Sequence, residues 1–382
     1  MRNVNVSSYI LLFFSALCLS ACQSTNVSTR PTPSLLDANF PEYSSYKIES
    51  SEEIFALDDA MKSFINTNTA EQSGDKAKLT HLIKAIFGQA QLSLSYQAGA
   101  NSTAIETFHQ GAANCLSLTI MMYAMSEHLN MRSQFQNIDI PEYWTRRMGQ
   151  TMINHHINLK VYPRESKNKA LLVDFDPQEN IEKLDATLIS KANTVSLFYS
   201  NKASDYMLKN DANKAYAYLR AAIKKDPTNT SAWLNLGVLS SQNKLYQQAD
   251  SYYRMALNLK PGFSSAYENL ALLYERQGKA QKAKQILKQL HKKRLANPYY
   301  HMINGDLAME NDAYSKAIQH YKSAISLNNL SHEFHFKLAK AYFENGDINR
   351  SQRYLEKAMM RTKDKRLSER YASKLSDMFT AS

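Results

Sequence analysis

The chain has few glycines and cysteines, 10 and 3 among its 382 residues. Neither the P-loop pattern nor GxGxxG occurs, so the sequence gives no support to a Gly-rich loop that cradles phosphate groups. HExxH and CxxC are also missing, which leaves a metal site weakly supported. We therefore expect no nucleotide, no other cofactor and no metal.

One long apolar run stands near the start of the chain, over residues 9–19. It follows a positively charged N-terminus and is too short for a permanent membrane span, which is typical of an export signal. Residues 19–22 (Leu-Ser-Ala-Cys) resemble a bacterial lipobox, and this resemblance implies a leader over 1–22 with a lipid on Cys22. Gln23 after it favours the outer membrane, facing the periplasm. An ordinary signal peptide cleaved nearby is the alternative.

Length and composition divide the rest of the chain into a tether and two domains. The residues after Cys22 are rich in Ser, Thr and Pro with little to bury, so 23–50 are predicted to be a flexible tether. Mixed helical and strand patterns extend over 51–192, and a helical repeat extends over 196–365. Residues 366–382 are then expected to form a helix that caps the end of the array.

Cys115 is the one cysteine outside the leader. A polar, Gly-containing stretch leads to Asn114, and an apolar pattern at helical spacing starts directly afterwards, so we expect the thiol in the first turn of a helix. The N–H groups and the positive dipole of that turn favour thiolate. A lone thiol in an exported protein is exposed to oxidation, which favours its use as a nucleophile. An inert buried cysteine is the alternative.

The pattern changes from helical to alternating after Cys115, which predicts an α+β domain. A charged turn over 164–169 joins the last two strands, so we expect them to form a hairpin. The expected helices cover 54–65, 76–87 and 115–129, and the expected strands cover 132–138, 156–162 and 170–176, with a short strand or linker over 92–96.

A cysteine nucleophile needs a base for its proton and a third group that orients the base. His155 and His156 begin one predicted strand, and Asp174 and Asp176 end its predicted partner. Because neighbouring strands lie about 4.8 Å apart, a histidine on one and a carboxylate on the other can form a hydrogen bond.

This order of residues resembles the transglutaminase-like superfamily, which has a papain-like fold. The matching segments are 113–117 (Ala-Asn-Cys-Leu-Ser), 156–161 (His-Ile-Asn-Leu-Lys-Val) and 173–177 (Val-Asp-Phe-Asp-Pro). The resemblance implies that Cys115 is the nucleophile, His156 the base and Asp174 the group that orients the base. The neighbouring histidine and the second aspartate stay open as alternatives. Ala113 stands where the family usually has Gly.

The implied chemistry is acyl transfer through a thioester on Cys115. N–H groups at the helix start would hold the oxyanion. Water as the acceptor makes the protein a protease or amidase, and an amine makes it a transglutaminase. The 41 residues between Cys115 and His156 argue against the papain and cathepsin branch, in which about 130–150 are expected.

A 34-residue period runs without insertion from residue 196. Small residues recur at positions 20 and 27 of this period, and larger ones at position 24, such as Tyr253 and Leu287, are expected to fill the space between repeats. The pattern is identified as five tetratricopeptide repeats, which form an all-α solenoid. The frames start at Ser196, Thr230, Ser264, Pro298 and His332.

The resemblance to tetratricopeptide repeats implies a concave groove lined by positions 2, 5, 9, 12 and 13 of each frame. Side chains at these positions are mostly acidic or apolar, which favours an extended protein or peptide partner. The predicted groove residues are Met207, Leu234, Glu268, Glu275, Met302, Asp306, Met309, Phe336 and Phe343.

Positive charge is concentrated in the repeats. Residues 1–195 carry 16 Lys/Arg and 19 Asp/Glu, a net charge of −3, whereas residues 196–382 carry 30 and 16, a net charge of +14. Because an exported chain rarely meets nucleic acid, our hypothesis is that the basic surface lies near anionic envelope lipid or polymer. The alternative is that the lysines only keep the protein soluble.

Together these patterns predict a membrane-anchored envelope protein with a cysteine acyl-transfer site and a repeat domain that binds a protein partner. The alternative is a catalytically idle scaffold whose repeats assemble an envelope complex, because repeat arrays bind partners more often than they catalyse reactions. Rapid reaction of Cys115 with iodoacetamide near neutral pH distinguishes the two.

Overall fold

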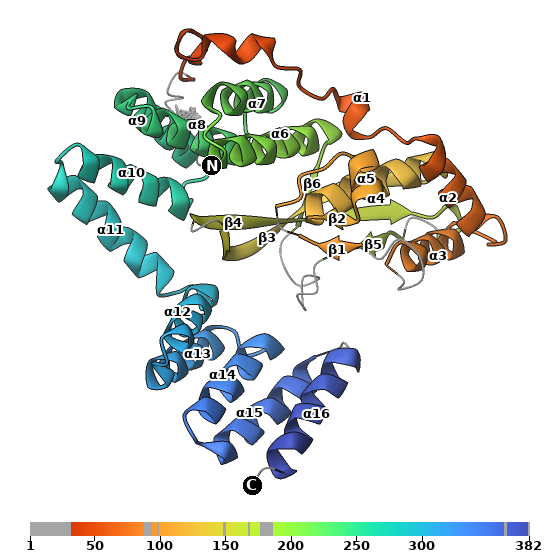
Figure 1. Cartoon of the computed structure of the whole chain (residues 1–382), viewed down its shortest axis with the longest axis vertical. Coiled ribbons are helices and arrows are strands. Elements are labelled where there is room, and N and C mark those ends of the chain that lie inside the picture. Colours follow the sequence, from red (N-terminus) through yellow and green to blue (C-terminus); the bar gives the residue numbers. More distant parts are fainter. Residues whose placement is uncertain are drawn as a thin grey trace, which may run out of the picture. The chain divides into compact units, whose positions relative to one another are not determined.

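The structure is a computed structural model that describes residues 32–87, 94–97, 99–147, 150–166, 169–175, 186–362 and 365–380. Its first part combines helices with strands, and paired helices follow along the chain (Figure 1). The first helices are α1 (Ser51–Ile54), α2 (Asp59–Thr69), α3 (Asp75–Phe87), α4 (Ala104–Gln110) and α5 (Cys115–His128). The strands are β1 (Ser95–Tyr96), β2 (Ala112–Ala113), β3 (Arg132–Arg147), β4 (Gln150–Tyr162), β5 (Leu171–Val173) and β6 (Ala186–Ile189).

The single helix predicted over 54–65 is wrong, because two helices with separate caps occupy this part of the chain. Ser50 and Glu53 form a capping box at the start of α1. Asp58 accepts a hydrogen bond from the Met61 N–H at the start of α2. Each cap satisfies N–H groups that lack a partner at the start of a helix. The next predicted helix is confirmed by α3.

Four strands form an antiparallel sheet in the order β5-β4-β3-β6. The predicted hairpin is confirmed, since β4 pairs with β5 and the 3-10 helix η3 (Arg164–Ser166) lies in the turn between them. β3 and β4 extend beyond the predicted 132–138 and 156–162, with an irregular register between Ile138 and Tyr143. β6 corresponds to no predicted strand. β1 and β2 pair in parallel in a separate small sheet.

Paired helices follow the sheet, and their starts confirm four of the five predicted frames. α8, α10, α12 and α14 each begin at the first residue of a frame. The final helix confirms the predicted cap, because its Tyr371 is buried and stacks on Phe336 with the ring centroids 4.8 Å apart. The helices are α6 (Lys191–Leu208), α7 (Ala212–Lys225), α8 (Thr230–Gln242), α9 (Tyr246–Leu259), α10 (Ser264–Arg276), α11 (Ala280–Arg294), α12 (Pro298–Glu310), α13 (Tyr314–Leu327), α14 (His332–Glu344), α15 (Ile348–Arg361) and α16 (Lys365–Thr380).

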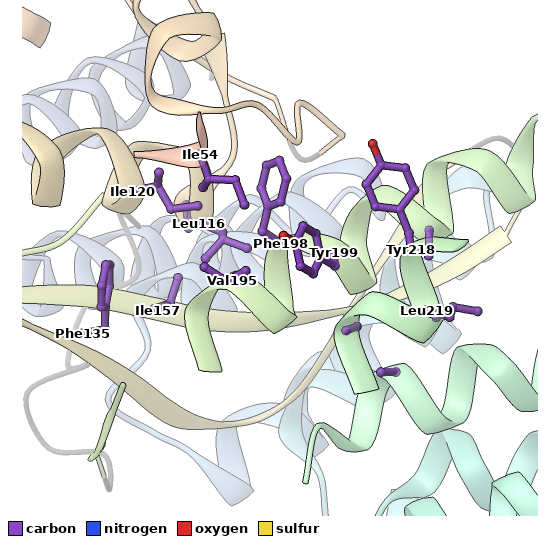
Figure 2. Close-up of a cluster of buried hydrophobic side chains, with 14 of the residues drawn as sticks. Ile54, Leu116, Ile120, Phe135, Ile157, Val195, Phe198, Tyr199, Tyr218 and Leu219 are labelled. Atoms are coloured by element: carbon purple, nitrogen blue, oxygen red, sulfur yellow. The ribbon is translucent and has the colours of Figure 1, made fainter. Parts of the chain in front are cut away.

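The predicted separation of two domains at residues 192–196 is wrong, because these residues lie inside α6. Ser190 and Asn193 form a capping box that starts this helix ahead of the repeat frame. Side chains of α6 and α7 belong to the same buried cluster as those of α5 and β4, as Val195 and Leu116 illustrate (Figure 2). The sheet-containing part of the chain therefore shares one core with the first repeat.

Positions 8 and 24 of a repeat face each other across its two helices. A Cβ added at Gly237 would lie 2.5 Å from the Tyr253 ring, and one added at Gly305 would lie 2.4 Å from the Tyr321 ring. The other three repeats carry alanine at position 8 and leucine at position 24. The side chains at the two positions therefore match in size: glycine faces tyrosine, and alanine faces leucine. A close-packed core leaves no room for an extra methyl group against the tyrosine ring.

Leu287 contradicts the prediction that position 24 fills the space between repeats, since it is 39% exposed. The buried cluster of the first part of the chain ends at Ala283 of α11, and a second cluster begins at Met302 of α12. Within the described residues, no buried apolar cluster joins the two. The apolar core is therefore divided between the third and fourth repeats.

The flexible tether predicted over 23–50 is wrong for its second half, which packs on α7. Phe40 is buried and stacks on Tyr216 with the ring centroids 4.7 Å apart. Asp37 accepts hydrogen bonds from both Tyr216 and Arg220. Composition did not indicate this docking, because a few separate side chains provide it. The segment contains two short 3-10 helices, η1 (Asp37–Asn39) and η2 (Pro41–Ser45).

Candidate functional sites

The loop before α5 places Cys115 at the start of the helix. Gly111 ends α4 in the left-handed conformation, with φ 66°, which glycine adopts without strain. Ala113 is buried in β2, so the glycine that turns the chain lies two residues before it. Asn114 accepts a hydrogen bond of 2.9 Å from the Ser117 N–H and caps α5. Cys115 is therefore the first residue of the helix, as predicted.

Cys115 is a free thiol that is 8% exposed. One turn further on, the Thr119 hydroxyl oxygen lies 2.7 Å from the Cys115 carbonyl oxygen and 3.4 Å from the Ile157 carbonyl oxygen. These contacts bring the first turn of α5 to β4, at the residue after His156. β5 pairs with β4 over residues 159–161. At Ile157, which precedes these residues, β5 therefore leaves the edge of β4 uncovered.

A histidine and an aspartate meet beside this edge. His156 Nε2 lies 2.8 Å from Asp174 Oδ2, and Asn158 Nδ2 donates to the same oxygen over 2.8 Å. The imidazole is 1% exposed and the carboxylate 17%. The predicted contact between His156 and Asp174 is therefore present. Asn158 is the residue that the sequence analysis missed, although strand alternation could have found it, since residues two apart share a face.

The two faces of β4 carry different side chains near Ile157. Alternation places His156 and Asn158 on one face, and Ile157 and Leu159 on the other. The second face packs in the core with α5, and Figure 2 shows Ile157 in this cluster together with Leu116. The convergence of the His156 imidazole and the Cys115 thiol stays a prediction.

Three predicted positions lie outside the described residues: the lipidation site Cys22, the alternative carboxylate Asp176 and the side chain of the alternative base His155. Among the helices that the structure describes, none is both long and apolar enough to cross a membrane. The described residues also contain no group of three or more His, Cys, Asp or Glu placed to hold a metal ion.

A cavity of about 620 Å³ opens among α12, α13 and α14. Three predicted groove residues, Asp306, Met309 and Phe336, line it. Its charged lining is mainly acidic, in a part of the chain that is otherwise strongly basic. The carboxylates belong to Asp306, Glu310, Asp312, Glu333 and Glu344, and the ammonium groups belong to Lys337 and Lys340.

Asp306 organises one wall of this cavity. Both of its carboxylate oxygens lie 3.0 Å from Lys337 Nζ, and Tyr321 donates its hydroxyl to the same carboxylate over 2.6 Å. Burial, together with this hydrogen bond, raises the pKa of Tyr321 above its usual value, so the phenol keeps the proton that it donates. Because Lys337 is paired with Asp306, the other carboxylates dominate the charge offered to a ligand.

Tyr314 and Tyr321 line the cavity from α13, and the groove prediction missed them. That prediction considered only positions in the first helix of each repeat. A signal existed for Tyr321, because Gly305 faces it and leaves room for the ring to reach Asp306.

The other predicted groove residues do not line this cavity. Leu234 and Met302 are buried in the apolar cores, 9% and 3% exposed, so their prediction as partner contacts is wrong. The rest are distributed as follows: Met207 is partly buried against the first core, Glu268 forms an ion pair with Arg294, and Glu275 and Phe343 are exposed.

Comparison with known families agrees with the helical pairs. Models described as tetratricopeptide repeat match residues 201–263, 265–294 and 332–365, and a model described as TPR repeat matches 305–346. The helical array is a tetratricopeptide-repeat solenoid. The match over 332–365 coincides with the fifth predicted frame of this solenoid.

Similarity to individual proteins is low and partial. The chain is 26% identical over 190 residues to Protein O-mannosyl-transferase TMTC1 of Homo sapiens, which is 47% of this chain and 20% of that protein. It is 23% identical over 230 residues to human TMTC3, which is 59% of this chain and 24% of that protein. The chain thus spans a quarter or less of these relatives. The structure of Pseudomonas aeruginosa pilF shares 16% identity at a TM-score of 0.28, covering 50% of this chain and 87% of that one.

Proposed function

We propose that the tetratricopeptide repeats bind an extended segment of a partner protein and that the cavity among α12, α13 and α14 receives part of it. The observation that carries this proposal is the cavity itself, whose volume lies in the range of ligand pockets. Met309 and Phe336 supply apolar contact area, and the carboxylates around them supply charge.

The charge of the cavity favours a basic segment. Five carboxylates and two ammonium groups line it, so the formal net charge is −3. Opposite charges across an interface speed encounter and exclude like-charged competitors. We therefore expect the bound segment to carry lysine or arginine next to an apolar or aromatic side chain that contacts Phe336.

Selection of displayed random peptides on the full-length protein tests this proposal. The expected selected peptides combine basic and aromatic residues, and calorimetry should show that Glu310→Gln/Glu344→Gln weakens their binding roughly tenfold. Glu356→Gln on α15 is the matched control, because it removes an exposed carboxylate outside the cavity. Selection of acidic peptides, or equal binding by all variants, would exclude a basic segment as the ligand.

We infer cysteine acyl transfer as a second candidate function, favoured by the 2.8 Å contact between His156 and Asp174 near the first turn of α5. The Cys115 sulfur would attack a carboxamide or peptide carbonyl and form a thioester, while His156 passes the proton to the leaving amine. Water or a second amine would then release the acyl group. Asp174 would orient the imidazole, and Asn158 would hold Asp174.

The rate of alkylation at Cys115 tests this candidate without a known substrate. Mass spectrometry of the Cys115 peptide after timed exposure to iodoacetamide separates it from the cysteines of the leader. We expect rapid alkylation near neutral pH, slowed roughly tenfold by His156→Gln because the thiolate loses its partner. The exposed His81→Gln is the control. If His156→Gln leaves the rate unchanged, the part around Cys115 is an idle scaffold.

The proposal also includes a lipid on Cys22 that holds the protein in the bacterial envelope, at the outer membrane and facing the periplasm. The four residues that end at Cys22 support it. Metabolic labelling with an alkyne fatty acid in a Gram-negative host should label the wild type and Cys18→Ser but not Cys22→Ser. Label that persists in Cys22→Ser would contradict the anchor.

A further inference from the structure

Helix α11 carries an unusual concentration of positive charge for a helix of this solenoid. Its 15 residues include five lysines and one arginine and no aspartate or glutamate. Only Ala283 and Leu290 of the helix are buried. Most of its side chains therefore meet solvent, because the apolar core is divided between this helix and α12.

Three positive groups of α11 make contacts with other parts of the fold. Lys293 donates to the Gly262 carbonyl group, and Arg294 forms an ion pair with Glu268. Lys282 lies over the Tyr274 ring, 5.8 Å from its centroid. These three are used within the fold.

The three other lysines of α11 form a stripe along the helix. Lys284, Lys288 and Lys292 are exposed and recur every four residues, so they lie on one face of the helix. Leu287 and Leu295, which are 39% and 47% exposed, lie beside them. We call these five residues the α11 stripe.

We propose that the α11 stripe docks on a membrane surface that contains anionic lipid. The three ammonium groups have no acidic neighbour on their helix, so their charge complements that of lipid phosphates. Each lysine strengthens binding to such a surface about fivefold. The two exposed leucines decide between lipid and an anionic polymer. Apolar side chains between lysines gain free energy by entering the boundary between headgroups and acyl chains, whereas a polyanion offers them no apolar phase. This surface is separate from the cavity proposed for a partner protein, so either proposal can fail without the other.

Binding of the full-length protein to vesicles tests this proposal. For each variant, partition into phosphatidylcholine vesicles that contain phosphatidylglycerol is divided by partition into phosphatidylcholine vesicles alone. This ratio cancels the contribution of the apolar leader, which every variant keeps. We expect Lys284→Gln/Lys288→Gln/Lys292→Gln to lower the ratio roughly 100-fold. Lys224→Gln/Lys225→Gln/Lys316→Gln removes the same charge from exposed sites on other helices and should lower it less than about threefold.

A second variant tests the apolar half of the stripe. Leu287→Ser/Leu295→Ser should weaken binding to the anionic vesicles and leave binding to heparin unchanged. An equal loss in both lysine triples would show that only net charge matters and would overturn the assignment to α11. Vesicle binding that is insensitive to the leucine changes and is displaced by heparin would overturn lipid as the partner and favour an anionic polymer.

Discussion

Glycine and tyrosine at facing positions determine how closely the two helices of the second repeat approach. Gly237→Ala places a Cβ 2.5 Å from the Tyr253 ring. Alanine gains about 1 kcal/mol in helix propensity, but overpacking costs about 1–3 kcal/mol. We therefore expect the free energy of unfolding to fall by about 1 kcal/mol in urea titrations.

The matching change on the other helix should remove that strain. Gly237→Ala/Tyr253→Leu creates the alanine and leucine combination that the first and fifth repeats carry. A double-mutant cycle should then show a favourable coupling of about 1 kcal/mol or more. Gly305→Ala with Tyr321→Leu provides an independent repeat of the measurement. Additive effects in both cycles would contradict the matching of these positions.

Two histidines make the last repeats sensitive to acid. Burial, with the charge of His301, lowers the pKa of His320 from its ordinary 6.5. Burial is also the main cause that lowers the pKa of His335. The unfolded chain therefore binds protons more readily than the folded chain, so the stabilisation is complete above about pH 6.5 and is lost as the pH falls below it.

Urea midpoints measured on both sides of that pH check this prediction. The wild type should lose stability in the acidic series, and His320→Asn/His335→Asn should lose less between the two series. The exposed His81→Asn is the control and should follow the wild type. If the double variant is as sensitive to acid as the wild type, other groups are responsible.

Local rules explain which parts of the cysteine site could be predicted from the sequence. Asn114 as a cap and the change of pattern after it placed Cys115 at a helix start. Strand alternation and the hairpin placed His156 next to Asp174. The position of the sulfur relative to the imidazole follows from how α5 packs against the edge of β4, and no short-range pattern determines that.

At the scale of elements, Asp37 fastens the segment before α1 to α7. Its carboxylate accepts hydrogen bonds from Arg220 over 2.8 and 3.0 Å and from Tyr216 over 2.5 Å. The hydrogen bond from Arg220 is the main cause that lowers the pKa of Asp37. The stabilisation from this carboxylate is therefore present above about pH 3.8 and is lost as the pH falls below it.

Asp37→Asn should release this segment without unfolding the repeats. Because the pair is partly exposed, we expect a loss of about 1 kcal/mol. Hydrogen exchange should become faster in residues 36–48 and stay unchanged in α8 and α9. Glu42→Gln is the control, because Glu42 makes one exposed contact of 3.1 Å with Asn213. Unchanged exchange in Asp37→Asn would show that apolar and aromatic packing, such as that of Leu36 and Phe40, holds the segment.

Periodicity explains why the repeat helices were easier to predict than the segments around them. Each repeat buries the same positions, so the pattern recurs five times and its frame starts agree with α8, α10, α12 and α14. The segment around Asp37, the strand β6 and the start of α6 each depend on single contacts or caps. Periodicity also indicates which face of α11 is apolar, but not that α12 leaves Leu287 exposed.

At the scale of the whole molecule, the described part of the chain has one core that extends from the sheet into the third repeat and a separate one in the fourth and fifth repeats, with a small third cluster between the fifth repeat and α16. Leu236 belongs to the first cluster and Leu338 to the second, and both are fully buried. In a repeat array, cooperativity passes through the interfaces between neighbours. A weak apolar contact between α11 and α12 should therefore allow the two parts to unfold separately.

Two spectroscopic probes can separate these transitions. Trp233 is buried in the first core, so its fluorescence in a Trp144→Phe background reports on that core, whereas circular dichroism reports on all helices. Leu338→Ala should cost about 2–5 kcal/mol in the second core and lower the dichroism midpoint in urea while the fluorescence midpoint stays unchanged. Leu236→Ala should shift the fluorescence midpoint instead. Coincident midpoints in the wild type and in both variants would mean that other contacts couple the two cores as strongly as apolar packing does elsewhere. Such contacts include the approach of β3 to α12 and the 3.1 Å contact between His301 Nε2 and the Leu295 carbonyl oxygen.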